Sequence, residues 1–382
     1  MEPSQLRVAL FSGNYNYVRD GANQALNLLV GHLLGAGVTM RVYSPTTAKP
    51  AFPPVGDLVD VPAIAVPFRP DYRLGLGLPR RPREDVEAYR PDIVHLSAPD
   101  ILGHRAIKWA KRHGIPTIAS LHTRFETYPA FYGLGFLEKP AIRISTRFYN
   151  SVDKVLVPSP SMGDLLRQWG VTTPIGIWSR GIDHDRFNPS RRDLEWRRSL
   201  GIGDDEVAVS FLGRLVLEKG LGIFADVVAA LKARGVPHKV LVVGEGPARS
   251  WFAERVPDAV FTGFLSGNDL GRAVASMDVF FMPSTTETFG NVTTEAMAAG
   301  VPVVAARATG SVDLVDDGVT GFLVPPTDVT AYADAIQRLI EDPALRTAAG
   351  RAGHVAAQPY VWDKVNAAVL DEYLALMASR AG

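Results

Sequence analysis

The sequence contains no cysteine among its 382 residues. Disulfide bonds, thiolate nucleophiles and cysteine-ligated zinc or iron–sulfur centres are therefore excluded, and any catalysis has to use other groups. The first residues lack a basic segment followed by an apolar stretch, and no run of about 18 apolar residues is free of charge. We therefore expect neither a secretory leader nor a membrane span, and a cytoplasmic location.

Net charge is absent as well, because 40 Lys and Arg balance 40 Asp and Glu. The balance is not local: residues 1–185 carry +5 and residues 186–382 carry −5. The basic excess lies largely in Arg69, Arg73, Arg80, Arg81, Arg83, Arg105, Lys108, Lys111, Arg112, Lys139, Arg143 and Arg147. A basic half suits an anionic partner, namely nucleic acid, acidic lipid headgroups or a phosphorylated substrate, although solvated helix faces give the same pattern.

Short runs rich in Val and Ile alternate with longer stretches of helical spacing, which is typical of parallel βα units. A first series has strands at 6–13, 38–45, 92–98, 116–122 and 154–159, and a second at 207–214, 238–246, 259–264, 279–284 and 302–306. Two series indicate two doubly wound α/β domains. We expect boundaries of 1–183 and 184–363, with a helix at about 364–382 that packs back on the first domain. Two such domains facing each other would enclose a cleft.

The most specific segment is 210–231, where a strand is followed by Gly213, Arg214, Lys219 and a helix. Two cations beside a helix N-terminus form a receptor for a diphosphate, since the helix end adds free N–H donors and about half a positive charge. The alternative is a surface Arg and Lys on a βα loop.

A second segment, 283–305, strengthens the diphosphate interpretation. Glu287 and Glu295 flank Gly290 ahead of a helical run. If the helix begins near Gly290, Glu287 lies in the loop before it and Glu295 about a turn and a half inside. Carboxylates accept hydrogen bonds from vicinal hydroxyls, so one can hold a hexose and the other a ribose, with phosphate at the helix end. The pattern indicates a nucleotide sugar site.

Together these segments resemble the donor domain of retaining glycosyltransferase family 4, whose signature is two glutamates after a strand with a Gly-Arg…Glu-Lys-Gly turn upstream. The matching residues are Glu287, Glu295, Gly213, Arg214, Glu218, Lys219 and Gly220. WSRGIDHDRFNP, FTGFLSG, DVFFMPS and VVAARATG are similar to the branch of lipid glycosyltransferases that includes sulfoquinovosyl-diacylglycerol synthase and glycolipid mannosyl- and glucuronosyltransferases. The resemblance implies a GT-B fold of two Rossmann-like domains facing a central cleft.

The resemblance also assigns roles. Arg214 and Lys219 would stabilise the leaving diphosphate, Glu295 would hold the ribose, and Glu287 the donor hexose. The main chain at the helix start would contact the sugar and the phosphates, through Phe289, Gly290, Asn291, Val292 and Thr293. Gly244 and residues 262–264, ending at Phe264, would line the nucleobase pocket. UDP is favoured, with GDP-mannose second.

In the first domain, Asp20 and Gly21 precede a helix, where the main chain can approach phosphate and sugar closely. The family often has two glycines there, so Asp20 is a departure from its pattern. His122 ends a strand, and the resemblance places it at the donor sugar, through its main chain or its ring. The alternative for His122 is a histidine satisfied within the strand end.

Metal chemistry has little support in the sequence. No His and carboxylate spacing is typical of a metal site, and Asp183-His184-Asp185 lies at the domain joint. We expect no required cofactor, with at most a nonessential Mg²⁺, and leaving-group stabilisation by Arg214 and Lys219.

Residues 123–150 alternate aromatic and basic side chains among prolines and glycines. Segments that bind at a membrane interface typically insert apolar side chains into it and have Arg and Lys beside them. We expect this face, with Tyr128, Phe131, Tyr132, Leu134 and Phe136, to dock on an anionic bilayer at the inner side of the cytoplasmic membrane and to admit a lipid acceptor.

The sequence therefore predicts a retaining hexosyltransferase that moves a hexose or hexuronic acid from a nucleoside diphosphate sugar to a lipid hydroxyl. Its catalytic set is Arg214, Lys219, Glu287 and His122. Three alternatives stay open: a GDP-mannose-dependent mannosyltransferase acting on a lipid or glycan, a UDP-sugar epimerase, and a nucleic-acid-binding protein. The last lacks a recognised basic–aromatic module, and the acidic second half argues against it.

Overall fold

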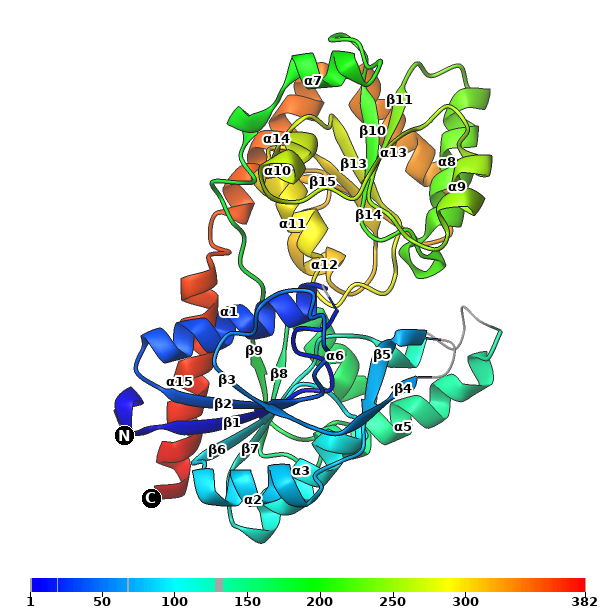
Figure 1. Cartoon of the computed structure of the whole chain (residues 1–382). Coiled ribbons are helices and arrows are strands. Elements are labelled where there is room, and N and C mark those ends of the chain that lie inside the picture. The colour runs from blue at the N-terminus through cyan, green and yellow to red at the C-terminus, as the bar shows by residue number, and fades with distance from the viewer. Residues whose placement is uncertain (1, 19, 67–68, 128–132, 382) are drawn as a thin grey trace. The chain divides into compact units, whose positions relative to one another are not determined.

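The computed structural model describes residues 2–18, 20–66, 69–127 and 133–381, and divides the chain into two compact units (Figure 1). The first unit runs to Gly181 and resumes at Trp362, and the second occupies Ile182–Val361. The boundaries expected from sequence, after Asp183 and Asp363, lie two residues further along at each crossing. Among the described residues, no helix is both long and apolar enough to cross a bilayer.

The first unit is built on a parallel sheet in the strand order β3-β2-β1-β6-β7-β8-β9. Its strands are β1 (Arg7–Phe11), β2 (Thr39–Ser44), β3 (Asp57–Asp60), β6 (Ile93–Leu96), β7 (Thr117–Ser120), β8 (Lys154–Val157) and β9 (Ile175–Ile177). A separate antiparallel hairpin joins β4 (Ala63–Val66) to β5 (Arg69–Gly75).

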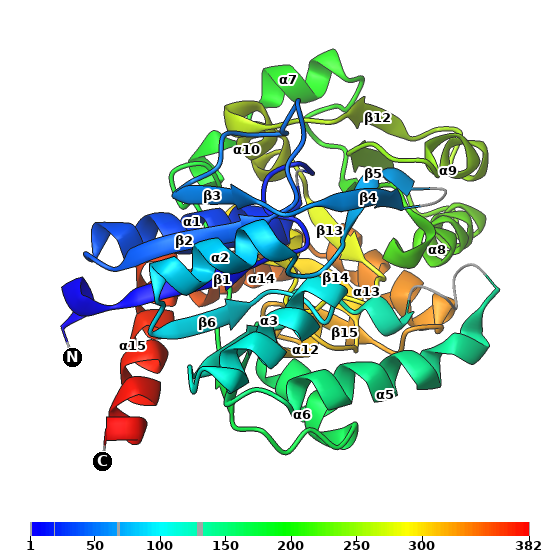
Figure 2. The ribbon, with the colours of Figure 1, turned by 60° about the horizontal axis from the view of Figure 1, so that its bottom comes forward.

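Helices cover both faces of this sheet (Figures 1 and 2). They are α1 (Gly21–Gly35), α2 (Arg80–Tyr89), α3 (Ile101–Arg112), α5 (Glu138–Tyr149), α6 (Pro160–Gln168) and α15 (Trp362–Ala381), with 3₁₀ turns at Pro3–Gln5, Phe125–Thr127 and Gly135–Leu137. Successive residues of β1 enter two cores, because side chains alternate across a strand. Val8 and Leu10 pack in the core beneath α1 and α15, whereas Ala9 and Phe11 pack in the core on the other face.

The second unit has a parallel sheet in the order β12-β11-β10-β13-β14-β15. Its strands are β10 (Ala208–Leu212), β11 (Lys239–Val243), β12 (Val260–Gly263), β13 (Val279–Met282), β14 (Val303–Ala306) and β15 (Gly321–Val324). Its helices are α7 (Leu194–Ser199), α8 (Leu221–Ala233), α9 (Arg249–Arg255), α10 (Gly267–Ala275), α11 (Asn291–Ala298), α12 (Ser311–Leu314), α13 (Val329–Glu341) and α14 (Pro343–Ala357), with 3₁₀ turns at Pro189–Arg191 and Leu217–Lys219.

The fold class predicted from sequence is confirmed: each unit carries its own parallel sheet, with helices on both sides. The strands of a sheet covered on both faces are buried throughout, which explains why they read as continuous apolar runs. The core of the second unit is aromatic at its centre, where Phe224 and Phe281 stack with their ring centroids 5.0 Å apart. The short strands β3, β4, β5, β9 and β15 were not among those predicted.

Arg197 is a fully buried arginine that ties the start of β13 to α7. Its guanidinium donates to the Ser276 carbonyl at 2.7 Å, to Asp278 at 2.8 Å and to the Glu206 carbonyl at 2.5 Å. A buried charge is tolerated only when it is paired and hydrogen-bonded in this way. Arg197 therefore anchors the beginning of the strand that leads to the Glu287 loop, together with Arg192, which also donates to Asp278.

Replacing Arg197 with Leu should destabilise the protein by about 3 kcal/mol, because the carbonyls that it satisfies lose their donor inside the core. The neighbouring variant Arg198→Leu is the matched control, since the Arg198 side chain is 59% exposed. Urea denaturation followed by circular dichroism measures both. Equal midpoints for the two variants would contradict this account of Arg197.

Candidate functional site

In the second unit the strand order reverses between β10 and β13, which lie side by side in the sheet. At such a switch point the loops leave the sheet in opposite directions, and open α/β sheets bind their ligands there, beyond the carboxyl ends of the strands. The loop after β10 carries Arg214 and Lys219, and the loop after β13 carries Glu287. The structure thus places these three candidate residues at one edge of one sheet.

Lys219 and Glu287 contact each other directly, although they are far apart in the sequence. The Lys219 ammonium donates to Glu287 Oε1 at 2.6 Å, and only 10% of the Glu287 side chain is exposed. Burial opposes ionisation of Glu287, but the Lys219 charge, with hydrogen bonds from Lys219 and Ser284, outweighs burial and holds the pKa of Glu287 below its usual value. The two groups therefore form a buried, ionised pair, which the sequence did not predict.

Arg214 supplies a second cation near this pair. Its side chain is exposed, and among the described residues it makes no hydrogen bond or ion pair. The loop is fixed through the main chain instead, because the Leu215 and Val216 amides donate to the carbonyls of Glu245 and Arg214. Arg214 is therefore available to an anionic ligand, whereas Lys219 is already engaged.

The helix predicted near Gly290 is α11, and Gly290 is its N-cap residue. Phe289 is buried, with its ring edge-on to Tyr360, while Asn291 and Val292 are partly exposed. Thr293 is fully buried, and its hydroxyl has no partner within the described part of the chain. The first turn of α11 thus presents free N–H groups at the strand edge, as an anion site requires.

The loop at the end of the VVAARATG segment, to which the sequence analysis gave no role in the site, packs on this site. Between β14 and α12, the Thr309 hydroxyl donates to the Glu287 carbonyl at 2.9 Å. Gly310 has φ of 78°, and a Cβ at that position would lie 2.6 Å from the Phe289 carbonyl oxygen. Only glycine permits this approach. Gly310, four residues after the predicted strand 302–306, was the available signal.

The edge beside β10 is formed by main chain from neighbouring strands. The Gly213 amide donates to the Val243 carbonyl, and the Gly244 amide to the Gly263 carbonyl. A Cβ on Gly244, whose φ is 139°, would lie 2.0 Å from the Gly213 carbonyl oxygen. Phe264 follows directly and is 66% exposed. Gly213 and Gly244 leave the main chain bare at this edge, and a planar base can stack on the exposed ring of Phe264 beside it.

Glu295 lies on α11, about a turn beyond its start, as predicted. Burial raises the pKa of Glu295 to about 8, against the opposing charge of Arg186. At neutral pH the group is therefore mostly a carboxylic acid, whereas the sequence analysis treated it as a carboxylate. Its ability to accept hydrogen bonds from two hydroxyls depends on pH.

In the first unit, Asp20 is the N-cap of α1. Its carboxylate accepts the Asn23 amide at 2.8 Å and the Asn23 side-chain amide at 3.1 Å. Gly21 opens the helix and is exposed. The structure thus gives Asp20 a capping function that follows from its residue type, and leaves the main chain of Gly21 accessible.

His122 lies two residues after the end of β7, at the carboxyl edge of the first sheet. Its Nε2 lies 2.8 Å from the Ser120 hydroxyl, and its Nδ1 accepts from Arg180 at 2.8 Å. Both ring nitrogens are therefore engaged inside the unit. The sequence analysis considered that His122 contacts the donor sugar through its main chain or through its ring. Because both ring nitrogens are engaged, the geometry favours the main chain of His122 for this contact.

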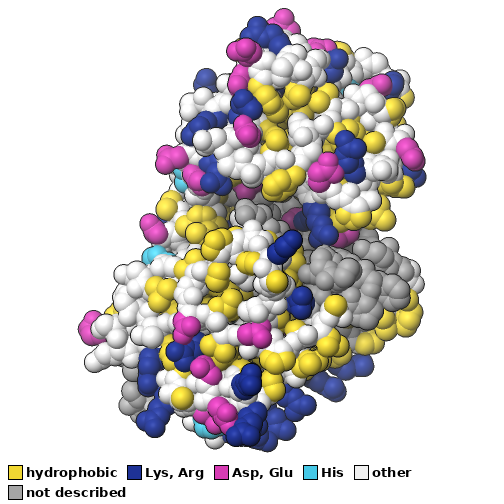
Figure 3. All heavy atoms as spheres, in the orientation of Figure 1, with side chains coloured by type: hydrophobic (Ala, Val, Ile, Leu, Met, Phe, Trp, Pro, Cys, Tyr) yellow, Lys and Arg dark blue, Asp and Glu magenta, His cyan; other side chains and the backbone are white. Residues whose placement is uncertain are grey.

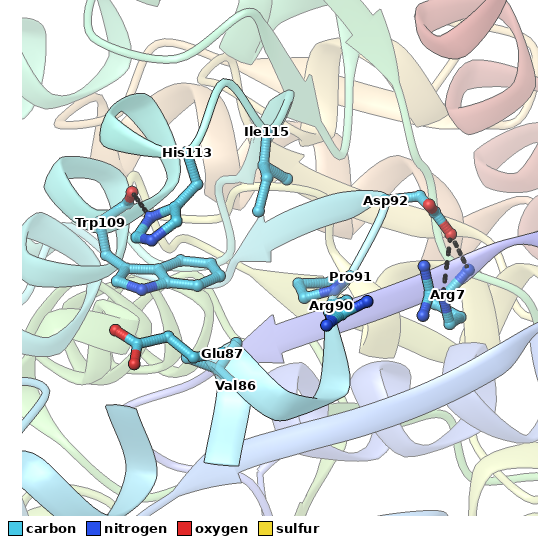
Figure 4. Close-up of a pocket in the computed structure, with 9 residues that line it drawn as sticks. All are labelled: Arg7, Val86, Glu87, Arg90, Pro91, Asp92, Trp109, His113 and Ile115. Carbon is cyan, nitrogen blue, oxygen red and sulfur yellow. Dashed lines mark hydrogen bonds and ion pairs between the residues drawn. The ribbon is translucent and has the colours of Figure 1, made fainter. Parts of the chain in front are cut away.

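A pocket of about 420 Å³ opens elsewhere on the first unit (Figure 4). Its lining residues are Arg7, Val86, Glu87, Arg90, Pro91, Asp92, Trp109, His113 and Ile115. Arg7 begins β1 and Asp92 precedes β6, so the pocket lies at the amino ends of the strands. Arg7 and Asp92 also pair with each other. The pocket is therefore remote from the candidate residues of this sheet and is not assigned to substrate.

Asp183 and His184, which suggested a metal motif, belong to the chain crossing. Asp183 accepts the Arg186 amide at 3.0 Å and pairs with the Arg186 side chain. Across the described ranges, no group of three His, Asp or Glu side chains is placed to hold a metal ion.

Comparison with known proteins agrees with this geometry. Residues 19–186 match the family model described as Glycosyltransferase Family 4, and residues 206–342 the model described as Glycosyl transferases group 1. A GDP-mannose-dependent alpha-mannosyltransferase of Corynebacterium glutamicum is 30% identical over 98% of this chain and 90% of its own length. Sulfoquinovosyl transferase SQD2 of Arabidopsis thaliana is 34% identical over 80% of this chain, which spans only 61% of that relative.

Solved structures share the fold. The sucrose-phosphate synthase of Thermosynechococcus elongatus aligns over 98% of this chain and all of its own, with a TM-score of 0.76 and 24% identity. The Anabaena protein HepE, crystallised with UDP, aligns over 97% of this chain and all of its own, with a TM-score of 0.74 and 20% identity.

Two parallel-sheet units, with a cationic turn, a loop glutamate and a helix glutamate at one strand edge of the second unit, define a GT-B glycosyltransferase. The chain belongs to glycosyltransferase family 4. The family resemblance seen in the sequence is thus confirmed, and the protein is an enzyme that transfers sugar.

The pKa of Glu295 generates a test. Because the group ionises only near pH 8, the KM for the nucleotide sugar should fall roughly tenfold between pH 7 and pH 9, in step with the ionised fraction. Glu295→Gln, which cannot ionise, should have a flat profile over the same range. Steady-state kinetics with each donor measures both. Parallel profiles for the two proteins would remove Glu295 from the donor site.

Proposed function

We propose that this enzyme transfers a hexose or hexuronic acid from a nucleoside diphosphate sugar to a hydroxyl of a membrane lipid, with retention at the anomeric carbon. The observation that carries the proposal is the Lys219–Glu287 pair, 2.6 Å apart, in front of the α11 N-terminus and in the unit that also offers Arg214. Cations and helix N–H groups complement a diphosphate, and a carboxylate complements sugar hydroxyls.

The proposed reaction relies on electrostatics more than on a nucleophile. As the bond from the sugar to the diphosphate breaks, negative charge grows on the phosphate oxygen, and Arg214, Lys219 and the first N–H groups of α11 stabilise it. The departing oxygen takes the proton of the acceptor hydroxyl on the same face of the sugar. This front-face route gives retention and needs no base from the protein.

Two donors compete in this proposal. UDP-sugars remain our first choice from the sequence resemblance, and likeness to the Arabidopsis sulfoquinovosyl transferase supports a glycolipid product. Likeness to GDP-mannose-dependent mannosyltransferases extends over a larger share of this chain, up to 98% of it. We therefore keep GDP-mannose as an equal second candidate. The exposed Phe264 beside the glycine edge fits either base.

A donor panel tests the proposal. Radiolabelled UDP-glucose, UDP-glucuronic acid and GDP-mannose are incubated with diacylglycerol, phosphatidylinositol or ceramide in vesicles, and label is sought in the lipid phase. Transfer from one donor supports the function and names the sugar. Conversion of the donor sugar without any acceptor would identify an epimerase instead, and release of free sugar alone would contradict a lipid acceptor.

In the same assay, Lys219→Ala should lower turnover by about two to three orders of magnitude, because the leaving group loses a cation that stabilises its charge. Lys232→Ala is the matched control, since Lys232 forms a surface pair with Asp258 in the same unit and its side chain is 72% exposed. Circular dichroism checks that both variants are folded. Activity near the wild-type level in Lys219→Ala would refute the assignment.

We propose further that α5 and the turn before it dock on an anionic membrane. Exposed apolar side chains lie at Leu134, Phe136, Leu137 and Ile144, and Phe136 is 73% exposed. Lys139, Arg143 and Arg147 lie on α5 at intervals of four residues, so they form one basic stripe along the helix, next to these apolar side chains. Figure 3 shows hydrophobic side chains beside Lys and Arg at the lower right, where Figure 1 places α5.

The stripe is free to bind anions, because Lys139, Arg143 and Arg147 form no ion pair with any described residue. Each cation near an anionic surface contributes about 1 kcal/mol, and the apolar side chains add burial in the headgroup region. Three aromatic residues that the sequence analysis assigned to this face, Tyr128, Phe131 and Tyr132, lie outside the described residues.

Neutralising Arg143 and Arg147 together by substitution with Gln should weaken binding to phosphatidylglycerol vesicles roughly thirtyfold, the equivalent of two lost cations. Lys108→Gln with Lys111→Gln, on the exposed side of α3 in the same unit, is the control of equal charge and should bind as the wild type. Vesicle sedimentation measures each. Equal binding to neutral and anionic vesicles would exclude this surface.

A further inference from the structure

Buried polar side chains form a continuous chain across the first unit, from its last helix to the end of β7. The Tyr373 hydroxyl on α15 lies 2.5 Å from His95 Nδ1, and His95 Nε2 lies 2.8 Å from the Ser120 hydroxyl. Ser120 is 2.8 Å from His122 Nε2, and Arg180 donates to His122 Nδ1 at 2.8 Å. Hydrogen bonds thus connect five side chains, which come from β6, from β7 and the residues after it, from the segment after β9, and from α15.

Every member of the chain except His122, which is partly exposed, is closed off from water. Tyr373 and His95 are fully buried, and Ser120 and Arg180 are at most 3% exposed. Trp178 fills the space beside it, edge-on to both rings, with centroid distances of 6.1 Å to His95 and 5.2 Å to His122. Burial lowers the pKa of His95 to about 3, and burial, Arg180 and His95 together lower the pKa of His122. Both rings are neutral at physiological pH.

Arg180 determines where the His122 proton lies. A guanidinium only donates, so His122 Nδ1 must be the acceptor and carry no proton. In a neutral ring the proton is then on Nε2, which donates to the Ser120 hydroxyl. Arg180 is held for this task by its other donors, which bind the carbonyls of Trp178 and Ser179 at 2.9 and 3.0 Å.

The same count of donors and acceptors shows which ring nitrogen of His95 carries the proton, and Tyr373 determines it. Within the described part of the chain, His95 is the only acceptor placed for the Tyr373 proton, so Tyr373 donates to His95 Nδ1. His95 therefore carries its proton on Nε2 and also donates to Ser120. The Ser120 proton then goes to the Leu96 carbonyl at 3.5 Å. The opposite arrangement leaves the buried Tyr373 proton without an acceptor, which costs about 1–3 kcal/mol.

We propose that Tyr373, His95, Ser120 and Arg180 are positioning residues for His122, which they hold as the neutral Nε2–H tautomer with both ring nitrogens engaged. The inference rests on the proposed function and on the family resemblance, which implies that His122 lies at the donor sugar. In this state His122 transfers no proton and presents its main chain at a fixed place. The last helix of the chain thereby acts, through His95 and Ser120, on a residue of the reaction site.

The tautomers can be observed directly. In the full-length protein labelled with ¹⁵N-histidine, two-bond ¹H–¹⁵N correlation spectra at pH 7 distinguish a protonated from an unprotonated ring nitrogen. Loss of signals in His95→Gln and His122→Asn assigns the two residues. We expect both as Nε2–H tautomers, with His122 changing to a mixture in Arg180→Met. A doubly protonated or Nδ1–H His122 in the wild type overturns the proposal.

Tyr373→Phe removes one buried hydroxyl and tests the effect on the reaction. We expect kcat for nucleotide release from UDP-glucose or GDP-mannose to fall roughly tenfold, with KM unchanged, because a shift in His122 misplaces the reacting sugar. Tyr332→Phe is the matched control: its hydroxyl is also buried but has no partner among the described residues, so kcat should not change.

The outcomes separate this inference from the proposed function. If the tautomers are as expected but kcat is the same in Tyr373→Phe and Tyr332→Phe, the positioning proposal fails while the glycosyltransferase assignment stands. If the wild-type protein transfers sugar from neither donor, the proposed donors fail, and with them the claim that the chain serves the reaction. Expected tautomers together with a kcat loss confined to Tyr373→Phe support the proposal.

Discussion

The ion pair between Lys219 and Glu287 organises the second unit's strand edge. A carboxylate that is buried beside an ammonium stays ionised, and neither charge can be removed without leaving the other uncompensated in the interior. The pair therefore ties the loop after β10 to the loop after β13. The remaining parts, the α11 N-terminus and the Thr309 hydroxyl on the Glu287 carbonyl, are arranged around it. A diphosphate would have to share Lys219 with Glu287, which links leaving-group binding to the group proposed for the sugar.

The first unit holds its candidate residue, His122, by directional hydrogen bonds. A hydrogen bond with the Ser120 hydroxyl and another from the Arg180 guanidinium hold the His122 ring. Because hydrogen bonds have direction, such a chain specifies one tautomer as well as one position. One unit thus uses a charge pair to keep a group ionised, and the other uses a donor chain to keep a ring neutral.

Sequence patterns predicted the fold because buried apolar strands and the helices between them are local features. They missed β3, β4, β5, β9 and β15, of which β4 and β5 form a separate hairpin and β3, β9 and β15 lie at the edges of the sheets. The start of α11 at Asn291 was predictable from Gly290. The contact from Lys219 to Glu287 was not, because it joins residues 68 positions apart through the order of the strands. The same holds for His95, whose importance depends on a tyrosine 278 positions away.

The return of the chain to the first unit has a consequence for how the protein is made. Val365, Val369 and Tyr373 complete one core of that unit, yet they are among its last residues to leave the ribosome. During synthesis one apolar face of the first sheet is therefore covered by α1 alone and lacks α15 until the whole second unit has been produced. That second unit can close earlier, because its two ends, Ile182 and Val361, pair with each other. Premature termination within the last helix would leave a finished second unit attached to a first unit that lacks part of its core.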